Sequence, residues 1–273
     1  MRLATIRTRN GTAAVRVDPA ALVEIQGHDD VGQLLRQDNW RELAQAADGP
    51  RHAVDGADRA PVVPHPGKIV CVGHNYRNHI REMGREIPEY PALFAKYQES
   101  LIGPFDDLVL PPESSAVDWE AELAVVVGKA GRRIPFDEAE SYIAGYSVLN
   151  DVSMRDYQFR TVEWLQGKTW EASTPFGPDL VTVDEFSPGP LMTAAVDGAV
   201  MQQTPTGDLV FTPAFLVSYI STIITLNPGD VIATGTPGGV GHARDPKIYL
   251  KGGQVLETSI EGLGTLTNRI VEV

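Results

Sequence analysis

Short apolar runs dominate the chain from Lys68 onward, and their length and β-branched content predict strands. Two pairs of runs are separated by Gly-containing turns, an arrangement typical of β-hairpins. These pairs are 191–196 with 199–203 across Asp197-Gly198, and 255–260 with 265–271 across 261–264. The chain has no internal repeat and no low-complexity tract, so we expect one continuous β-rich body.

Few segments carry a helical period. Thr212-Pro213 predicts the N-cap and first residue of a helix, which Asn227-Pro228-Gly229 would end. The predicted buried side of this helix consists of Phe215, Leu216, Tyr219, Ile220, Ile223 and Ile224. A second helix is predicted from 137 to 143. The fold class is therefore α+β and predominantly β.

The first part of the chain has a different pattern. A hairpin signal, Asn10-Gly11, precedes the apolar residues 13–17, and a helical stretch follows over 31–47. Residues 48–67 contain four prolines and little periodicity, which indicates a linker. We therefore predict a small N-terminal α+β domain with its linker over 1–65 and a larger domain over 66–273.

Two glutamates stand at the head of the apolar run 118–127. Residues i and i+2 of a strand point to the same face, so Glu120 and Glu122 project together and Ala124 and Val126 continue that face. An unpaired carboxylate at the margin of a core costs several kcal/mol or more. A divalent cation would remove this cost, and oxygen-only ligands favour Mg²⁺, Mn²⁺ or Ca²⁺ over Zn²⁺.

Asp151 follows the apolar strand pattern 146–150 and is a candidate to complete a triad with the two glutamates. Taken alone, it would be interpreted as the first residue of a loop. Asp118 shares the parity of the glutamate pair and could compete with it as a ligand. The strand pattern does not choose between the two aspartates.

A histidine and a carboxylate are spaced for a general base in the segment 72–84. His79 and Glu82 are three residues apart, so on a helix they share one face, where the carboxylate can orient the imidazole. A solvated polar face would have the same spacing. His74 could be the base instead, and the spacing does not decide.

Two further candidates lie later in the chain. Lys168 is either a surface lysine or an anion anchor, and its position favours the surface. The segment 234–241 supplies glycines for close backbone approach, Gly235 among them, and a hydroxyl at Thr236. It lacks the lysine of a phosphate loop, so a nucleotide site is only weakly supported.

Composition excludes several classes of function. There are 23 Lys and Arg residues against 36 Asp and Glu, and the net charge of -13 argues against a nucleic-acid partner. No apolar run approaches the roughly eighteen residues of a membrane span, and the start of the chain lacks a signal-peptide core. We expect a cytoplasmic protein with no membrane partner. The lone Cys71 lies in an apolar run and is interpreted as a small buried hydrophobe.

Four motifs in order resemble the fumarylacetoacetate hydrolase family. They are Val72-Gly73-x-Asn75-Tyr76-x-x-His79-x-x-Glu82, Val117-Asp118-x-Glu120-Ala121-Glu122-Leu123, Asn150-Asp151-Val152-Ser153-x-Arg155-Asp156-x-Gln158 and Thr234-Gly235-Thr236-Pro237-x-Gly239-Val240-Gly241. The resemblance covers about 66–273, and the order of all four motifs makes it specific.

This resemblance implies a mixed β-roll or barrel-like fold, usually a homodimer. It implies Mg²⁺ or Mn²⁺ bound by Glu120, Glu122 and Asp151, and a dyad of His79 and Glu82 on a lid. It implies contacts to a substrate's carboxylate and oxo groups from Gln158, Lys168 and Thr236, with Gly235 beside them and Arg155 in support.

The implied substrate is a small 2-oxo acid. The main expectation is hydrolysis of a carbon–carbon bond in a 2,4-diketo acid of the acylpyruvate or fumarylpyruvate type, giving pyruvate and a carboxylic acid. His79 would activate water, and Lys168 would stabilise developing negative charge. The alternative is an oxaloacetate-type decarboxylase or a 2-hydroxyhepta-2,4-diene-1,7-dioate-type isomerase. The chain departs from the family pattern in 168–171 and at Met154, which touch the pocket wall and leave the substrate open.

Overall fold

A mixed sheet of eleven strands is the main element of the computed structural model. The structure describes residues 1–82, 84 and 86–272, and it does not describe the side chains of residues 79, 81 and 82. Its order is β4 (Arg51–His52), β3 (Ala21–Glu24), β2 (Gly11–Asp18), β1 (Arg2–Thr8), β13 (Thr174–Thr182), β11 (Ile143–Asn150), β10 (Ala121–Val127), β16 (Val231–Ala233), β5 (Ile69–Gly73) and β6 (Ala92–Lys96). The short strand β7 (Leu101–Ile102) pairs with β13. Most neighbours are antiparallel, and β16 with β5 is parallel.

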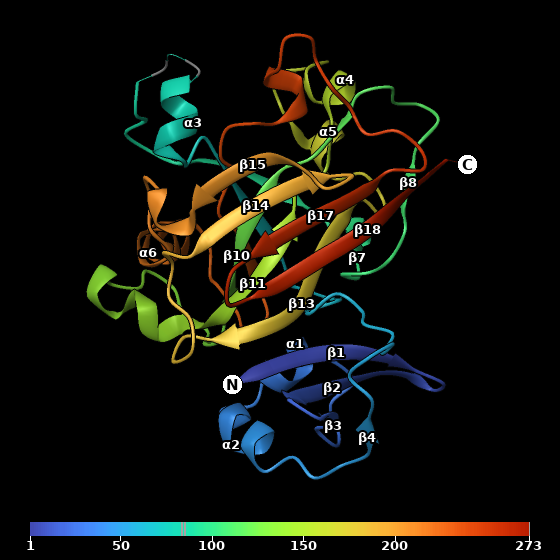
Figure 1. The fold of residues 1–273 in the computed structure, drawn as a ribbon. Coiled ribbons are helices and arrows are strands. Elements are labelled where there is room, and N and C mark those ends of the chain that lie inside the picture. The colour runs from blue at the N-terminus through green and yellow to red at the C-terminus, as the bar shows by residue number, and fades with distance from the viewer. Residues whose placement is uncertain (83, 85, 273) are drawn as a thin grey trace.

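A second sheet of five strands packs over the middle of the first (Figure 1). Its order is β15 (Ala199–Pro205), β14 (Leu191–Val196), β17 (Val255–Ile260), β18 (Gly264–Glu272) and β8 (Leu108–Leu110). A small ladder joins β9 (Val117–Asp118) to β12 (Ser153–Met154). The expected predominantly β, mixed-sheet fold class is confirmed.

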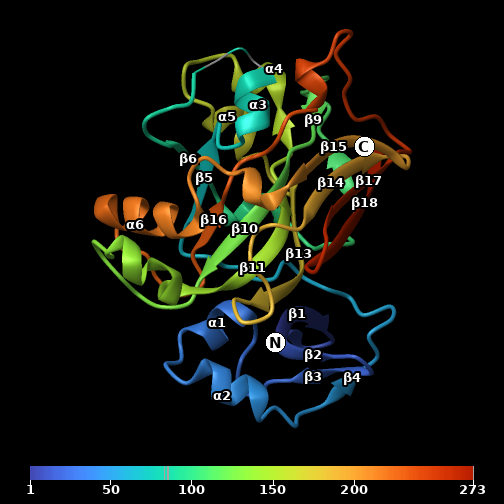
Figure 2. The same cartoon turned by 60° about the vertical axis from the view of Figure 1, so that its left-hand side comes forward.

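The helices are short and lie around the sheets. They are α1 (Val31–Leu35), α2 (Trp40–Gln45), α3 (Arg77–Glu82), α4 (Arg155–Gln158), α5 (Leu165–Lys168) and α6 (Pro213–Ile223), with 3₁₀ turns η1 (Gln98–Ser100), η2 (Phe136–Tyr142), η3 (Thr206–Asp208) and η4 (Gly241–Ala243). The helices α3, α4 and α5 gather at the end of the molecule opposite β1–β4 (Figure 2). No helix among the described residues is long and apolar enough to span a membrane.

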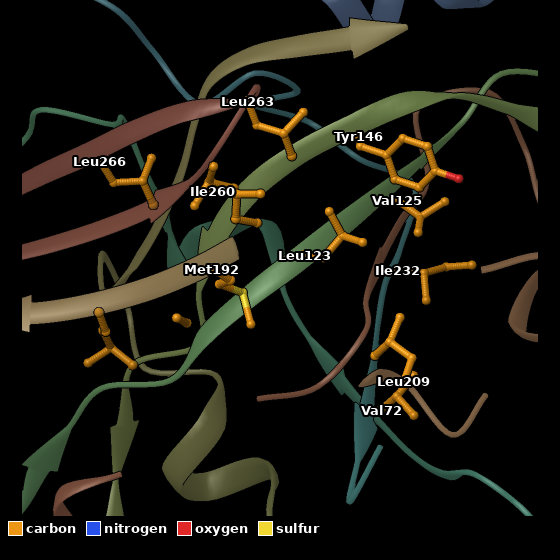
Figure 3. Close-up of a cluster of buried hydrophobic side chains, with 14 of the residues drawn as sticks. Val72, Leu123, Val125, Tyr146, Met192, Leu209, Ile232, Ile260, Leu263 and Leu266 are labelled. Atoms are coloured by element: carbon orange, nitrogen blue, oxygen red, sulfur yellow. The ribbon is translucent and has the colours of Figure 1, made fainter. Parts of the chain in front are cut away.

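The central strand β10 is buried on both faces. Leu123 and Val125 face the second sheet and belong to the largest apolar cluster, part of which Figure 3 shows. Ala124 and Val126 face the other way and pack in a cluster with residues of α1 and α2. Burial on two faces explains why this run is continuously apolar rather than alternating.

Several sequence predictions are confirmed. The hairpins β1–β2, β14–β15 and β17–β18 form as expected, and Asp197 and Gly198 both have positive φ, as a type I′ turn requires. Helix α6 begins after Thr212, whose hydroxyl accepts a hydrogen bond from the Phe215 amide at 3.3 Å. Cys71 is buried.

Other predictions differ from the structure. The helical stretch expected over 31–47 is two helices, α1 and α2, separated by residues 36–39. The helix expected over 137–143 is the 3₁₀ turn η2. Ile223 and Ile224 were expected on the buried side of α6, but they are 59% and 47% exposed because the helix ends there.

The N-terminal strands are continuous with the rest of the sheet. Leu3 of β1 pairs with Leu180 of β13, so β1–β4 extend the sheet that contains β10. The segment 48–67, predicted as a linker, packs closely: Val62 and Val63 are fully buried, and the Val62 amide donates to the carbonyl of Phe176 at 3.3 Å. Its prolines end local pairing rather than mark an exposed connection.

A buried ion pair also joins the two parts of the chain. Arg59 pairs with Asp179, and both side chains are only 7% exposed. We expect Asp179→Ala to lower the free energy of unfolding by about 3–5 kcal/mol, because it leaves the Arg59 guanidinium buried without a counter-ion. Urea unfolding followed by circular dichroism measures this change.

The matched control is Asp184→Ala, which removes the 61% exposed partner of Arg41. It should cost no more than about 1 kcal/mol. Equal decreases in the free energy of unfolding for the two variants would show that the buried pair contributes no more to stability than an exposed one.

Candidate metal centre and active site

The pairing of β10 with β11 brings three carboxylates together. Ala121 pairs with Asn150, so the residues that precede and follow them, Glu120 and Asp151, lie side by side, and the Asp151 amide donates to the Glu120 carbonyl at 2.9 Å. Glu122 lies two residues further along β10. One carboxylate oxygen from each of the three lies within 4.8 Å of the others. The candidate triad of Glu120, Glu122 and Asp151 therefore forms.

The competing ligand candidate, Asp118, is not part of this cluster. Its carboxylate accepts hydrogen bonds from Arg155 Nε at 2.8 Å and from the amides of Gly241 and His242 at 2.7 and 2.9 Å. It also accepts from the Trp119 amide at 2.9 Å. Asp118 thus holds Arg155 and the turn η4 in place, a role that strand parity alone did not indicate.

The three carboxylates are almost fully buried, and two of them, Glu120 and Asp151, form ion pairs with buried cationic side chains. Lys168 Nζ lies 2.7 Å from Glu120 Oε2 and 2.8 Å from Asp151 Oδ2, and its side chain is 3% exposed. The surface interpretation of Lys168 is therefore wrong, because α5 turns its last residue inward. Arg155 Nη1 lies 2.7 Å from Glu120 Oε1.

A second buried lysine, Lys96, was missed by sequence reasoning. It is the last residue of β6, and its Nζ donates to Asp151 Oδ1 at 2.7 Å, to the Lys168 carbonyl and to the Val152 carbonyl at 3.5 Å. Its position after the apolar residues 92–95 was the available signal. A lysine at a strand end ordinarily reaches solvent, so that signal is weak.

The carboxylates have opposite pKa shifts. Burial, followed by the negative charges of Asp151 and Glu120, raises the pKa of Glu122 well above its usual value. Burial also opposes ionisation of Asp151, but Lys168 and Lys96 outweigh it and lower the pKa of Asp151 to about 2. Of these two carboxylates, Glu122 is the one whose ionised form would gain more from a further positive charge.

This arrangement fits a divalent metal ion. Three buried carboxylates provide the hard oxygen donors that Mg²⁺ and Mn²⁺ prefer, and among the side chains that the structure describes no histidine or cysteine of the kind favoured by Zn²⁺ joins the cluster. The Gly235 amide donates to Glu122 Oε2 at 2.8 Å and orients this carboxylate. A side chain at Gly235 would meet the Val72 carbonyl at 2.7 Å, which explains the glycine.

A cavity of about 360 Å³ opens beside the cluster. Its polar lining comes from Glu120, Arg155, Gln158, Lys168 and Thr236, and its aromatic lining from His74, Phe94, Phe159, Trp164 and His242. Arg155 lines the cavity, and its buried Nη2 has no hydrogen-bond partner among the described residues, so this guanidinium keeps a donor that is not used within the protein. A lining that combines these polar groups with aromatic side chains suits a small planar acid.

Hydrogen bonds from neighbouring residues hold the polar side chains of the cavity lining in place. Gln202, which sequence reasoning also missed, donates to Thr236 Oγ1 at 2.8 Å and accepts from the Ala121 amide at 2.9 Å. Gln158 accepts from Arg155 Nη1 at 2.8 Å. Asn75 donates to the Thr234 carbonyl at 2.8 Å, which ties the first motif to the fourth.

The structure describes the side chain of only one of the two candidate bases, His74 and His79. The backbones of His79 and Glu82 lie in α3, but their side chains are outside the described part of the chain, so the dyad stays a prediction. His74 lines the cavity, with its ring edge-on to Trp164 at a centroid distance of 5.6 Å. Its backbone has φ of 54°, an uncommon conformation for a residue other than glycine.

Residues 68–271 match the family model for the fumarylacetoacetate hydrolase C-terminal domain. This chain belongs to the fumarylacetoacetate hydrolase family. The human mitochondrial oxaloacetate tautomerase FAHD2A is 45% identical over 216 residues, which cover 78% of this chain and 68% of that protein. The expected family resemblance is confirmed.

Two solved structures extend the likeness to the fold. Fumarylacetoacetate hydrolase from Exiguobacterium antarcticum has a TM-score of 0.90 and 31% identity, with both chains covered completely. Fumarylpyruvate hydrolase from Pseudomonas aeruginosa, in complex with Mn²⁺ and pyruvate, has a TM-score of 0.70 and 31% identity over 81% of this chain and 94% of that one. The family therefore includes named tautomerases and hydrolases.

The raised pKa of Glu122 predicts how metal stabilisation depends on pH. Without metal, the folded state holds a proton on Glu122 above the ordinary value of 4.5. The stability that this proton provides is lost as pH rises towards the raised pKa, and a divalent ion can replace it. The increase in Tm on replacing EDTA with Mn²⁺ should therefore grow as the pH rises above the ordinary value of 4.5.

Differential scanning fluorimetry at matched ionic strength measures this difference. Glu138→Gln, which changes an exposed carboxylate, should keep the same pH dependence. A Tm difference that is constant or largest at the acidic end would contradict the assigned protonation of Glu122.

Proposed function

We propose that this protein is a divalent-metal-dependent enzyme that stabilises the enolate of a small 2-oxo acid, and that its reaction is keto–enol tautomerisation of an oxaloacetate-type substrate. The observation that carries the proposal is the buried cluster of Glu120, Glu122 and Asp151. It adjoins a cavity whose lining includes the cationic side chains of Lys168 and Arg155. Tautomerisation is preferred because curated relatives at 43–45% identity carry that name.

The residues of the cavity have separable roles. Arg155 and the neighbouring Gln158 both line the cavity, and the guanidinium would bind the substrate carboxylate. Thr236, held by Gln202, offers a hydroxyl to an oxo group. A bound Mg²⁺ or Mn²⁺ would polarise the 2-oxo group as a Lewis acid.

Lys168 is placed to stabilise the negative charge that develops on the enol oxygen. Its ammonium is held by Glu120 and Asp151 at 2.7 and 2.8 Å, so little reorganisation accompanies the reaction. The enol proton leaves oxygen, and C3 gains a proton. A histidine of the segment 74–79 would carry that proton, either His74 or the predicted base His79.

The second candidate is hydrolysis of an acylpyruvate or fumarylpyruvate, as the sequence predicts. The observation in its favour is the 31% identity to the fumarylpyruvate hydrolase that binds Mn²⁺ and pyruvate. It needs the same enolate stabilisation and, in addition, a water activated by His79. The homodimer and the cytoplasmic location expected from the sequence stay predictions.

A substrate panel separates these reactions. With Mn²⁺ supplied, the purified protein should accelerate the loss of enol absorbance of oxaloacetate without releasing pyruvate or carbon dioxide. Lys168→Met should lower this rate by about 10²-fold or more, because a preorganised charge facing the enolate is lost. Lys251→Met, a change at an exposed lysine, should leave the rate unchanged.

Pyruvate release from acylpyruvates that exceeds tautomerisation of oxaloacetate would favour the second candidate. In that case His79→Ala should keep metal binding and lose hydrolysis. Carbon dioxide release as the fastest reaction would identify a decarboxylase, and no acceleration of any of these reactions would contradict the proposed function.

A further inference from the structure

Lys96 is a buried ammonium group that the proposed mechanism does not use. Its side chain is 0% exposed, and it is not among the residues that line the active-site cavity. Lysine is almost never fully buried without a specific partner. Here the partners are Asp151 Oδ1 at 2.7 Å and the carbonyls of Lys168 and Val152.

The two oxygens of Asp151 are divided between two lysines. Lys96 contacts Oδ1 from behind the cluster, and Lys168 contacts Oδ2 from the cavity side. When all three carboxylates are ionised, they and these two ammonium groups carry one net negative charge. Arg155 contacts Glu120 at 2.7 Å and Asp118 at 2.8 Å, and its charge is counted against that of Asp118. With a divalent ion added, the site would have one net positive charge. Without Lys96 it would be neutral.

We propose that Lys96 is a positioning residue that sets the charge of the metal site, lowering its affinity for the divalent ion and leaving a positive potential for an anionic substrate. Like charges repel strongly over a few ångströms where water is excluded, and Lys96 contacts Asp151, a member of the cluster, at 2.7 Å. The inference rests on the proposed metal-dependent function. It differs from a structural role, in which Lys96 only holds Asp151 in place.

The two roles predict opposite changes in metal affinity. If Lys96 only supports Asp151, its removal disorders a ligand and weakens metal binding. If Lys96 sets the charge, its removal tightens metal binding and weakens substrate binding. Lys96→Gln retains a donor for Asp151 without the charge, Lys96→Met removes both, and Lys96→Arg keeps the charge.

The experiment measures Mn²⁺ affinity by electron paramagnetic resonance of the free ion, with each variant purified in Mn²⁺ and then stripped with chelator. Lys96→Gln and Lys96→Met should bind Mn²⁺ about tenfold or more tightly than the wild type. Their KM for oxaloacetate should rise by a similar factor, and Lys96→Arg should remain near the wild type in both measurements.

Lys68→Met is the matched control, because it breaks a lysine pair with a buried carboxylate, that of Asp230, away from the cluster. It should lower Tm and leave Mn²⁺ affinity unchanged. Unchanged or weaker Mn²⁺ binding in both Lys96→Gln and Lys96→Met would overturn the inference. If Lys96→Met does not fold, the Lys96→Gln variant alone decides whether Mn²⁺ affinity rises or falls. A wild-type protein that binds no Mn²⁺ would instead refute the metal-dependent function itself.

Discussion

The burial of three carboxylates around one point is the constraint on which the rest of the site depends. Glu120, Glu122 and Asp151 are at most 7% exposed, and charges of one sign at this distance repel strongly in a medium of low dielectric. Two lysines offset part of this repulsion. Burial and the charges of Asp151 and Glu120 still raise the pKa of Glu122, so a divalent cation would complete the balance.

The fold meets this constraint with its central strands. The register of β10 against β11 sets Glu120 beside Asp151, and the parallel pair of β16 and β5 leads into the glycine segment that orients Glu122. Because β10 is covered on both faces by apolar clusters, its polar end is held rigidly. Rigid placement allows charges to act on a reaction without reorganising.

Much of the cluster could be predicted from the sequence. Strand parity relates Glu120 to Glu122, and the end of an apolar strand makes Asp151 a candidate, since both signals are local. The strand pattern left Asp118 as a competitor, and only the family resemblance chose Asp151. Lys96 and Gln202 could not be found in this way, because their roles depend on contacts with residues 55 and 81 positions away. Position alone favoured the surface for Lys168, and only the family resemblance assigned it to the site, because whether a lysine on a short helix points inward is decided by tertiary packing.

The fold shows the same limit. Hairpins with Gly-containing turns were predicted correctly, because their turn residues carry the information. The packing of 60–63 and the exposure of Ile223 and Ile224 depend on what lies opposite each segment. The choice between tautomerisation and hydrolysis is still less accessible, because both reactions use the same enolate-stabilising charges.

The most direct test of the account is the number of Mn²⁺ ions that each chain retains after gel filtration, determined by inductively coupled plasma mass spectrometry. The account predicts one ion per wild-type chain and none for Glu122→Ala, with exposed Glu138→Ala retaining one. A wild-type chain that retains no ion, or a Glu122→Ala chain that retains one, would contradict the assignment of the cluster as a metal site.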